Sequence, residues 1–256
     1  MNEDYMPQII AIIPARYDSK RLPGKVLLDL GGRAILHHVV DRALQSDCFT
    51  EVIVATDDER VVHYCNQNNI KVELTSSNLQ SGTDRVGAVA EKMKADYIIN
   101  LQGDEPFINI ADIKKLCHLL VRKKASIGTL YHEISDIDSL HDFNAVKVVV
   151  DKADKALYFS RQAIPAMRDK PYREWHKHHT YLKHIGVYGF ERSTLLKLTR
   201  LPKSPLELTE SLEQLRWLDN DYDIYCAKVL ESSIGIDTEE DLKRARKLMQ
   251  GMISEN

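Results

Sequence analysis

Four cations crowd into one ten-residue segment directly after an apolar run. The run "IIAIIPA" (9–15) is typical of a buried strand, and Arg16, Lys20, Arg21 and Lys25 follow it in "RYDSKRLPGK". Forked guanidinium groups, a point cation and the free backbone donors of a Pro-Gly turn together suit a triphosphate. The segment matches neither the Walker glycine loop nor the dinucleotide fingerprint. A solvated basic loop is the alternative, but its place after a strand favours phosphate binding.

Two acidic residues far apart in the chain are candidate ligands for Mg²⁺. Asp104 lies in "NLQGDEPFI" (100–108) at the end of a predicted strand, and Asp237 lies in "SIGIDTEEDL" (233–242) before a predicted helix. Mg²⁺ takes hard oxygen ligands and usually only one or two of them from protein. Each acid also has a structural interpretation, since Gly-Asp pairs favour tight turns and Asp237 or Thr238 could cap the helix.

A third polar motif, "SGTDRV" (81–86), stands at the start of a predicted helix. Ser81 and Thr83 offer hydroxyls, and Gly82 lets the backbone approach a ligand closely at the positive end of the helix. Arg85 could reach a base or a phosphate. A capped helix start, with Thr83 and Asp84 opening the helix, is the alternative interpretation.

The composition excludes several classes of protein. The chain has 256 residues, 43% hydrophobic and 29% charged, with a formal net charge of -3, which argues against a surface that coats nucleic acid. No apolar run approaches the length of a membrane span, and the acidic N-terminus does not read as a signal segment, so we expect a cytoplasmic protein. Four scattered cysteines (Cys48, Cys65, Cys117, Cys226) indicate buried free thiols.

The elements that must position these motifs alternate in type through the first half. Strands are predicted at 9–14, 51–56, 71–75 and 96–102, and helices at 34–45, 58–68, 84–93 and 111–124. Such alternation predicts an α/β fold with a mostly parallel central sheet and helices on both faces. Ligands of such sheets bind beyond the carboxyl ends of the strands, where the three motifs fall.

The pattern changes after residue 124. Strand-like pieces at 126–134, 145–151, 155–161 and 183–191 predict a mixed sheet extension or lobe over 124–190, and 165–180 reads as an irregular surface loop. One helix at 205–221, a strand at 223–229 and a helix at 238–252 complete the chain. We expect residues 1–256 to form a single domain.

Nine segments in this order resemble the 3-deoxy-manno-octulosonate (Kdo) cytidylyltransferase family, also called CMP-Kdo synthetases. They are "IIPARYDSKRLPGKVL", "VATDDERV", "SGTDRV", "INLQGDEP", "NAVKVVVD", "ALYFSRQAIP", "KHIGVYGF", "LEQLRWL" and "GIDTEEDL". The resemblance implies a nucleotide-diphospho-sugar transferase-like fold and a homodimer built through the second lobe. It also implies that CTP and Kdo combine to CMP-Kdo and pyrophosphate with Mg²⁺, for lipopolysaccharide synthesis.

The resemblance also implies roles for individual residues. Arg16, Lys25, Asp104 and Asp237 would be catalytic, with Asp104 and Asp237 as the metal ligands. The residues implied for the nucleotide are Pro14, Ala15, Arg16, Arg21, Lys25, Ser81, Gly82, Thr83, Arg85, Gln102 and Asp104. Those implied for the sugar are Gln102, Arg161, His184, Tyr188, Glu213 and Gln214. From the residues alone, a packed side chain in an alternating strand is the favoured interpretation of His184, and only the resemblance favours a role at the sugar.

Two other functions stay open at this point. A cytidylyltransferase of the acylneuraminate type would share the basic segment and the reaction, although "RLPGK" and "HIGVYGF" fit the Kdo type better. A module that binds CTP without turnover is the other, and two metal-positioning acids argue against it. The sequence does not distinguish Kdo from an 8-amino analogue.

Overall fold

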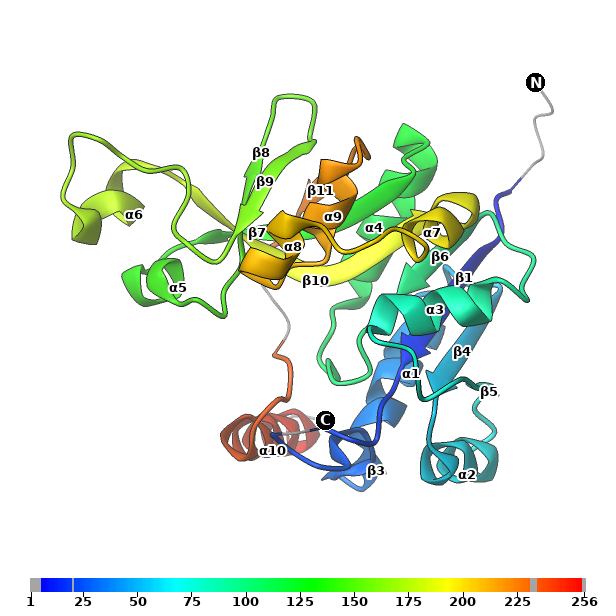
Figure 1. Ribbon diagram of the computed structural model, residues 1–256. Helices are drawn as coiled ribbons and strands as arrows, with labels where there is room; N and C mark the ends of the chain where they lie inside the picture. Colours follow the sequence, from blue (N-terminus) through cyan, green and yellow to red (C-terminus); the bar gives the residue numbers. More distant parts are fainter. Residues whose placement is uncertain (1–5, 20, 231–233, 255–256) are drawn as a thin grey trace. The chain divides into compact units, whose positions relative to one another are not determined.

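The computed structural model describes residues 6–19, 21–230 and 234–254 (Figure 1). Lys20, one of the four cations of the basic segment, lies outside the described residues. The chain folds into two compact units, Met1–Cys117 with Ser233–Asn256 and His118–Ser232. It passes from the first unit to the second within helix α4 (Ile110–Lys123).

The first unit is built on a parallel sheet. Its strands run in the order β6 (Tyr97–Asn100), β1 (Ile9–Pro14), β4 (Glu51–Thr56) and β5 (Val72–Leu74). All five side chains from Ile9 to Ile13 are buried. Because successive side chains of a strand point to opposite faces, both faces of this sheet must be covered. The α/β fold class predicted from the sequence is confirmed.

Helices of the first unit follow the predicted order. They are α1 (Ile35–Gln45), α2 (Glu59–Gln67), α3 (Gly82–Ala90) and α10 (Glu239–Ser254), with a 3₁₀ turn η1 at Lys25–Leu27 and a small hairpin of β2 (Asp29–Leu30) and β3 (Arg33–Ala34). Helix α3 packs on β1, β4 and β6. Asp58 is the N-cap of α2. The expected start of α3 was wrong by two residues, because Ser81 is the N-cap and Thr83 lies inside the helix.

The second unit carries a mixed sheet. Strand β10 (Tyr181–Glu191) runs antiparallel to β7 (Ile127–Ile134) and β8 (Lys147–Val150), β8 pairs antiparallel with β9 (Ala156–Ser160), and β11 (Tyr225–Lys228) runs parallel to β7. The mixed pairing expected over 124–190 is therefore present, in a unit that continues to residue 232. A single domain over 1–256 and a dimer built through this lobe stay predictions.

The helices of the second unit depart from expectation in several places, and those over 137–141 and 192–198 were not predicted at all. They are α5 (Ile137–His141), α6 (Trp175–His178), α7 (Arg192–Leu198), α8 (Pro205–Glu210) and α9 (Gln214–Asp219). One helix over 205–221 was wrong, because Ser211 adopts φ 52° and ends α8 in the left-handed conformation. The predicted irregular loop at 165–180 contains α6 and a 3₁₀ turn, η2, at Tyr172–Glu174.

Two expectations from composition can be compared with these units. All four cysteines are free, and three are buried while Cys48 is half-buried. Across the described ranges, no helix is both long enough and apolar enough to span a membrane.

Candidate active site

The basic segment leaves the sheet edge in a conformation fixed by backbone contacts. Ala15 N–H donates to the Ala55 carbonyl at 2.9 Å, which keeps the chain on the sheet for one residue past β1. Arg16 Nη2 then donates to the Leu79 carbonyl at 2.5 Å. Gly24 adopts φ +68°, and a Cβ there would lie 2.9 Å from Tyr17 Cζ. Only glycine fits both constraints, so the turn that returns the chain to Lys25 depends on it.

A small apolar cluster ties the basic segment to the end of the chain. Leu22 and Ile236 are both buried in it, together with Leu30, Ile35, Leu242 and Ala245. Ile236 N–H also donates to the Asp104 carbonyl at 2.9 Å. These contacts bring the residues on either side, Arg21 and Asp237, to the end of β6.

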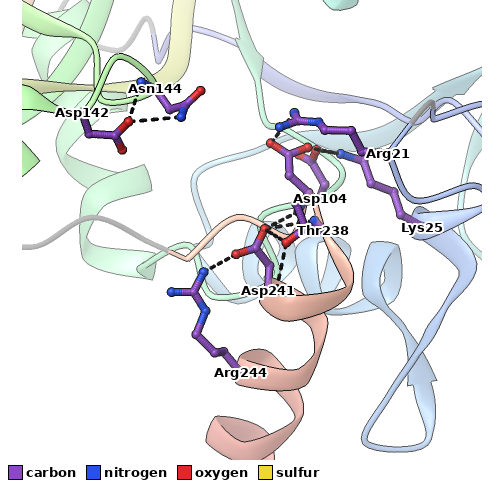
Figure 2. Close-up of polar contacts among 9 residues, drawn as sticks. Arg21, Lys25, Asp104, Asp142, Asn144, Thr238, Asp241 and Arg244 are labelled. Atoms are coloured by element: carbon purple, nitrogen blue, oxygen red, sulfur yellow. Dashed lines mark hydrogen bonds and ion pairs between the residues drawn. The ribbon is translucent and has the colours of Figure 1, made fainter.

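The two candidate metal ligands meet at one lysine. Figure 2 labels Lys25, Asp104 and Arg21 of this junction. Lys25 Nζ donates to Asp104 Oδ2 and, at 2.7 Å, to Asp237 Oδ1. Arg21 Nη2 lies 2.9 Å from the other oxygen of Asp237. The Lys25 side chain is only 12% exposed. Burial alone lowers the pKa of Lys25, but the two carboxylates outweigh it and the pKa lies above its ordinary value, so this lysine stays charged.

Asp237 does not cap the helix that follows it. Thr238 Oγ1 accepts from Asp241 N–H at 3.2 Å, and Asp241 Oδ2 accepts from Thr238 N–H at 3.0 Å. This reciprocal pair satisfies the start of α10 in the manner of a capping box. The Asp237 carboxylate is thereby left to the cations, and the structural alternative for it, a helix cap, is filled by Thr238.

The third motif supplies a helix N-terminus. Ser81 Oγ accepts from Asp84 N–H, and Asp84 Oδ2 accepts from Ser81 N–H, each at 3.0 Å. A Cβ on Gly82 would lie 3.5 Å from Pro14 and 4.0 Å from Gln102, so this turn of α3 lies beside the ends of β1 and β6. The positive end of the helix dipole therefore acts at the same place as the cations.

These segments enclose a cavity of about 360 Å³. Its lining residues are Pro14, Arg16, Asp18, Ser19, Arg21, Lys25, Val26, Gln80, Ser81, Gly82, Gln102, Gly103, Asp104 and Asp237. Among them are three basic and three acidic side chains, so their formal charges cancel. A polyphosphate cannot be held by such a set unless another cation neutralises the carboxylates.

The sequence found most of this lining but not all of it. Of the residues expected at the nucleotide, Ala15, Thr83 and Arg85 are buried and do not line the cavity as described. Asp18, Ser19, Val26, Gln80 and Gly103 line it and were not singled out. Ser19, Gln80 and Gly103 adjoin residues that were named, and Asp18 lies two positions after Arg16 inside the same basic segment. Val26 also follows a named residue, but an apolar side chain carries no chemical signal.

Gly103, in the turn after β6, lies very close to the end of β1. A Cβ on this residue would lie 2.9 Å from the Pro14 carbonyl oxygen, a backbone atom that cannot move aside easily. The glycine in "QGDE" is therefore required by packing. It allows Asp104 to follow β6 directly into the cavity.

Arg85 has a structural role in this structure. Its side chain is fully buried, Nη2 lies 2.6 Å from Asp57 Oδ2, and Nη1 donates to the Thr75 hydroxyl. The pair joins α3 to the loops that follow β4 and β5. The expectation that Arg85 would reach a base or a phosphate does not match this placement, because hydrogen bonds inside the first unit hold the guanidinium.

The residues implied for the sugar, other than Gln102, all belong to the second unit. His184 and Tyr188 lie on β10 with their rings 5.2 Å apart, and Tyr188 also packs on Trp217 at 5.0 Å. The Thr129 hydroxyl donates to the carbonyl oxygens of Ile185 and Val187. The Thr129 oxygen therefore accepts a hydrogen bond from His184 Nε2, which lies 3.0 Å away. Burial lowers the pKa of His184 to about 3, which keeps the ring neutral.

Tyr188 contributes an unusual hydroxyl. The oxygen is buried without a hydrogen-bond partner in the described part of the chain. Burial first, then the proximity of Cys226 and Glu213, raises the pKa of Tyr188 well above its ordinary value. The hydroxyl is therefore a neutral donor.

The other three sugar candidates gather around residues 210–216. Arg161 donates through Nε to the Glu210 carbonyl at 2.7 Å and through Nη1 to the Phe143 carbonyl at 2.9 Å. Glu213 Oε1 accepts from Arg216 Nη2 at 2.8 Å, and Gln214 is buried. The structure thus places all five in one unit, and their contact with a sugar stays a prediction.

The carboxylate pair fits a magnesium ion. Within the described ranges, no three His, Cys, Asp or Glu side chains gather as a metal cluster, and this includes the histidines at 176, 178 and 179. Asp104 and Asp237 converge on one cation, Lys25, which stands where a positive charge is required. Two carboxylates are the usual protein contribution to Mg²⁺, whose remaining ligands come from phosphates and water.

Comparison with known proteins places this geometry in context. The family model described as "Cytidylyltransferase" matches residues 10–228. A relative from Cytophaga hutchinsonii, named 3-deoxy-manno-octulosonate cytidylyltransferase, is 43% identical over 241 residues, covering 92% of this chain and 95% of its own. A relative of the same name from Parabacteroides distasonis is also 43% identical, over 246 residues, covering 94% of this chain and 97% of its own.

A solved structure is also similar to this chain over nearly its whole length. It is described as CMP:2-keto-3-deoxy-manno-octonic acid synthetase complexed with CTP, is 40% identical, and aligns with a TM-score of 0.90 over 96% of this chain and 99% of its own. A 4-diphosphocytidyl-2C-methyl-D-erythritol synthase from Anaerococcus prevotii, 15% identical with a TM-score of 0.61 over 95% of this chain and 99% of its own, shares the fold.

Proposed function

The chain belongs to the cytidylyltransferase family, and from that premise we propose that it transfers the cytidylyl group of CTP to Kdo. The products are CMP-Kdo and pyrophosphate, as an activation step in lipopolysaccharide synthesis. The observation that carries the proposal is the junction of Lys25 with Asp104 and Asp237 in a cavity that also holds Arg16 and the start of α3.

The cavity residues support an in-line displacement. The anomeric oxygen of the sugar forms a bond to the α-phosphorus while the bond from that phosphorus to the pyrophosphate oxygen breaks. Such reactions gain most from positioning and from neutralisation of charge. Arg16, Arg21 and Lys25 oppose the charge that grows on the leaving pyrophosphate, and the N-terminus of α3 adds donors for a phosphate or for the ribose.

Asp104 and Asp237 are the residues that would hold Mg²⁺. When bound, the ion supplies a positive charge near the α-phosphate and favours the deprotonated form of the attacking hydroxyl. The carboxylates fix where that charge lies, because Asp104 lies in the turn that follows β6 and Asp237 is held by the Ile236 contact. Lys25 remains within reach of both carboxylates and of the cavity that would hold the nucleotide.

The sugar-binding part of the proposal rests on the second unit. Arg161, His184, Tyr188, Glu213 and Gln214 would meet the carboxylate and hydroxyls of Kdo. The neutral His184 ring and the Tyr188 hydroxyl suit hydroxyl groups better than a carboxylate. We extend the proposal to a homodimer in the cytoplasm, to be tested by light scattering of the purified protein and by cell fractionation.

A substrate panel tests the function directly. The protein with Mg²⁺ and CTP is incubated with Kdo, with 8-amino-Kdo, with N-acetylneuraminic acid, or with no sugar, and CMP-sugar and pyrophosphate are measured by mass spectrometry. We expect product with Kdo and at least about a hundredfold less with N-acetylneuraminic acid, since groups without matching partners cost several kcal/mol. CTP binding without pyrophosphate release under every sugar would instead identify a nucleotide sensor.

A further inference from the structure

One side chain of the basic segment takes part in a stack with α2. Arg16, Asp18 and Ser19 line the cavity, whereas the ring of Tyr17 packs against Gly24 and Arg60. Arg60 Cζ lies 3.4 Å from the centroid of the Tyr17 ring. Gly24 N–H donates to the Tyr17 carbonyl at 2.9 Å, and its Cα approaches the ring so closely that a Cβ would lie 2.9 Å from Cζ.

The guanidinium in this stack is itself held in place. Arg60 Nε donates to Asp58 Oδ1 at 2.8 Å, and Nη2 donates to Asp58 Oδ2 at 2.5 Å. Asp58 Oδ1 also accepts from Arg60 N–H at 2.9 Å as the N-cap of α2. A bidentate pair of this kind fixes the plane of the guanidinium, so the ring of Tyr17 meets a flat surface with a set orientation.

The stack connects two parts of the first unit that the sheet alone does not join. Asp58 and Arg60 stand at the start of α2, and Tyr17 and Gly24 stand at the two ends of the turn that carries Arg21. Lys25 follows Gly24 directly and is the first residue of η1. Contacts that hold Gly24 therefore hold the position from which the Lys25 side chain extends.

We propose that Tyr17 and Arg60 are positioning residues for nucleotide binding, and this inference rests on the proposed function. The stacked pair fixes the basic segment against the start of α2, so that Arg16, Arg21 and Lys25 are already arranged when CTP arrives. Preorganisation of this kind improves affinity by removing the cost of ordering the segment on binding. Neither residue lines the cavity as described, and the charge of Arg60 is already matched by Asp58, so the proposed role requires no contact with the nucleotide.

The experiment compares variants in the ligand-free and CTP-bound protein. Tyr17→Leu and Arg60→Met remove the ring and the guanidinium, Tyr17→Phe keeps the ring, and Arg60→Lys keeps only the charge. Arg33→Met is the matched control, since Arg33 is as exposed as Arg60 (57% and 58%) and pairs with Asp41 at 2.8 Å. Amide exchange over residues 17–25 is measured without ligand, and the Kd for Mg-CTP by calorimetry at several salt concentrations.

We expect Tyr17→Leu, Arg60→Met and Arg60→Lys to speed exchange at Gly24 and Lys25 and to raise the Kd for CTP about three- to fivefold. This range corresponds to an exposed cation–π contact. Tyr17→Phe and Arg33→Met should stay within twofold of the unsubstituted protein. The kcat at saturating CTP and the slope of log Kd against log salt should be unchanged, because Arg60 meets no phosphate.

The proposal would be overturned if both Arg60 variants kept the amide exchange rates and the CTP affinity of the unsubstituted protein. A shallower slope of log Kd against log salt in these variants would also overturn it, because that result indicates a direct contact between Arg60 and a phosphate. If Tyr17→Leu does not fold, the two Arg60 variants test the proposal, since the Arg60 side chain is exposed and its replacement should not prevent folding. If the unsubstituted protein releases no pyrophosphate, the proposed function is contradicted but the positioning role is not. Amide exchange in the ligand-free protein still tests whether the Tyr17–Arg60 stack orders the basic segment.

Discussion

Lys25 Nζ lies 2.7 Å from Asp237 Oδ1, although 212 positions separate the two residues in the chain. The same ammonium group donates to Asp104 Oδ2, so one half-buried cation joins the basic segment, the turn after β6 and the segment before α10. In the ligand-free protein Lys25 and Arg21 together offset the charge of two carboxylates that would otherwise repel each other. A metal ion that binds these carboxylates must therefore compete with Lys25 or move it toward phosphate.

Replacement of Lys25 should strengthen metal binding in the absence of nucleotide. Lys25→Met removes the competing charge, and a unit charge about 4 Å away contributes up to about 4 kcal/mol near a protein surface. We expect Mn²⁺ titration followed by electron paramagnetic resonance to give at least about tenfold tighter binding. Lys92→Met, which removes an exposed partner of Glu73, is the control. Unchanged or weaker Mn²⁺ affinity in Lys25→Met would contradict the competition.

Asp104→Asn should lower turnover while the fold persists. The substitution removes one of the two carboxylates at the junction and keeps the shape of the side chain, which is part-exposed at 27%. Loss of a properly placed cation costs several kcal/mol of transition-state stabilisation, so pyrophosphate release from CTP and Kdo should fall at least about a hundredfold. Circular dichroism and thermal melting serve as the check on folding. Near-normal turnover would remove Asp104 from the mechanism.

Gly103→Ala should destabilise the first unit. The new methyl group would meet the Pro14 carbonyl at 2.9 Å, and relief requires a shift of backbone. We expect the free energy of unfolding in urea to fall by about 1–3 kcal/mol. Gly251→Ala, in α10 with open space around its Cβ position, is the matched control and should leave stability equal or slightly higher. Equal stability of both variants would show that the strand ends can separate without cost.

Arg85→Met should act on stability rather than through a lost nucleotide contact. It leaves Asp57 without its buried partner, and removal of one member of such a pair costs about 3–5 kcal/mol. Urea denaturation measures the loss, and Thr75→Val separates the hydroxyl contact from the ion pair. Unchanged stability together with lost CTP binding would restore the role at the nucleotide that the sequence suggested.

His184 should make the protein less stable in mild acid. Its pKa is lowered by burial to about 3, whereas in the unfolded chain it titrates near 6.5. Below pH 6.5 the unfolded state binds a proton that the folded state does not, so stability is full above that pH and falls as the pH drops toward 3. The loss should reach about 2 kcal/mol at pH 5.

Urea melts at pH 7.5 and pH 5.0 measure this dependence. His184→Gln should show a smaller decrease between the two pH values, whereas His63→Gln, at an exposed position on α2, should retain it. An equal decrease in all three proteins would assign the acid sensitivity to other groups.

The elements of the first unit could be predicted because their signals are local. Strand β1 and strand β4 match the predicted bounds, since a run of apolar side chains between turn residues identifies a buried strand without any knowledge of its neighbours. The start of α3 was harder, because Ser81, Thr83 and Asp84 can all cap a helix. Which of them does so depends on where the preceding chain arrives. The break at Ser211 likewise has no glycine or proline to signal it.

By itself, the sequence determined the α/β fold, the family, and the motifs that carry charge, since each depends on residue types and on their order along the chain. Only the tertiary structure decided which charges meet. The Ile236 contact with Asp104 brings the end of the chain to β6, and Arg85 turns inward to Asp57 and away from the cavity. Electrostatic partners are chosen by distance in space, and a periodic pattern along the chain holds no information about that distance.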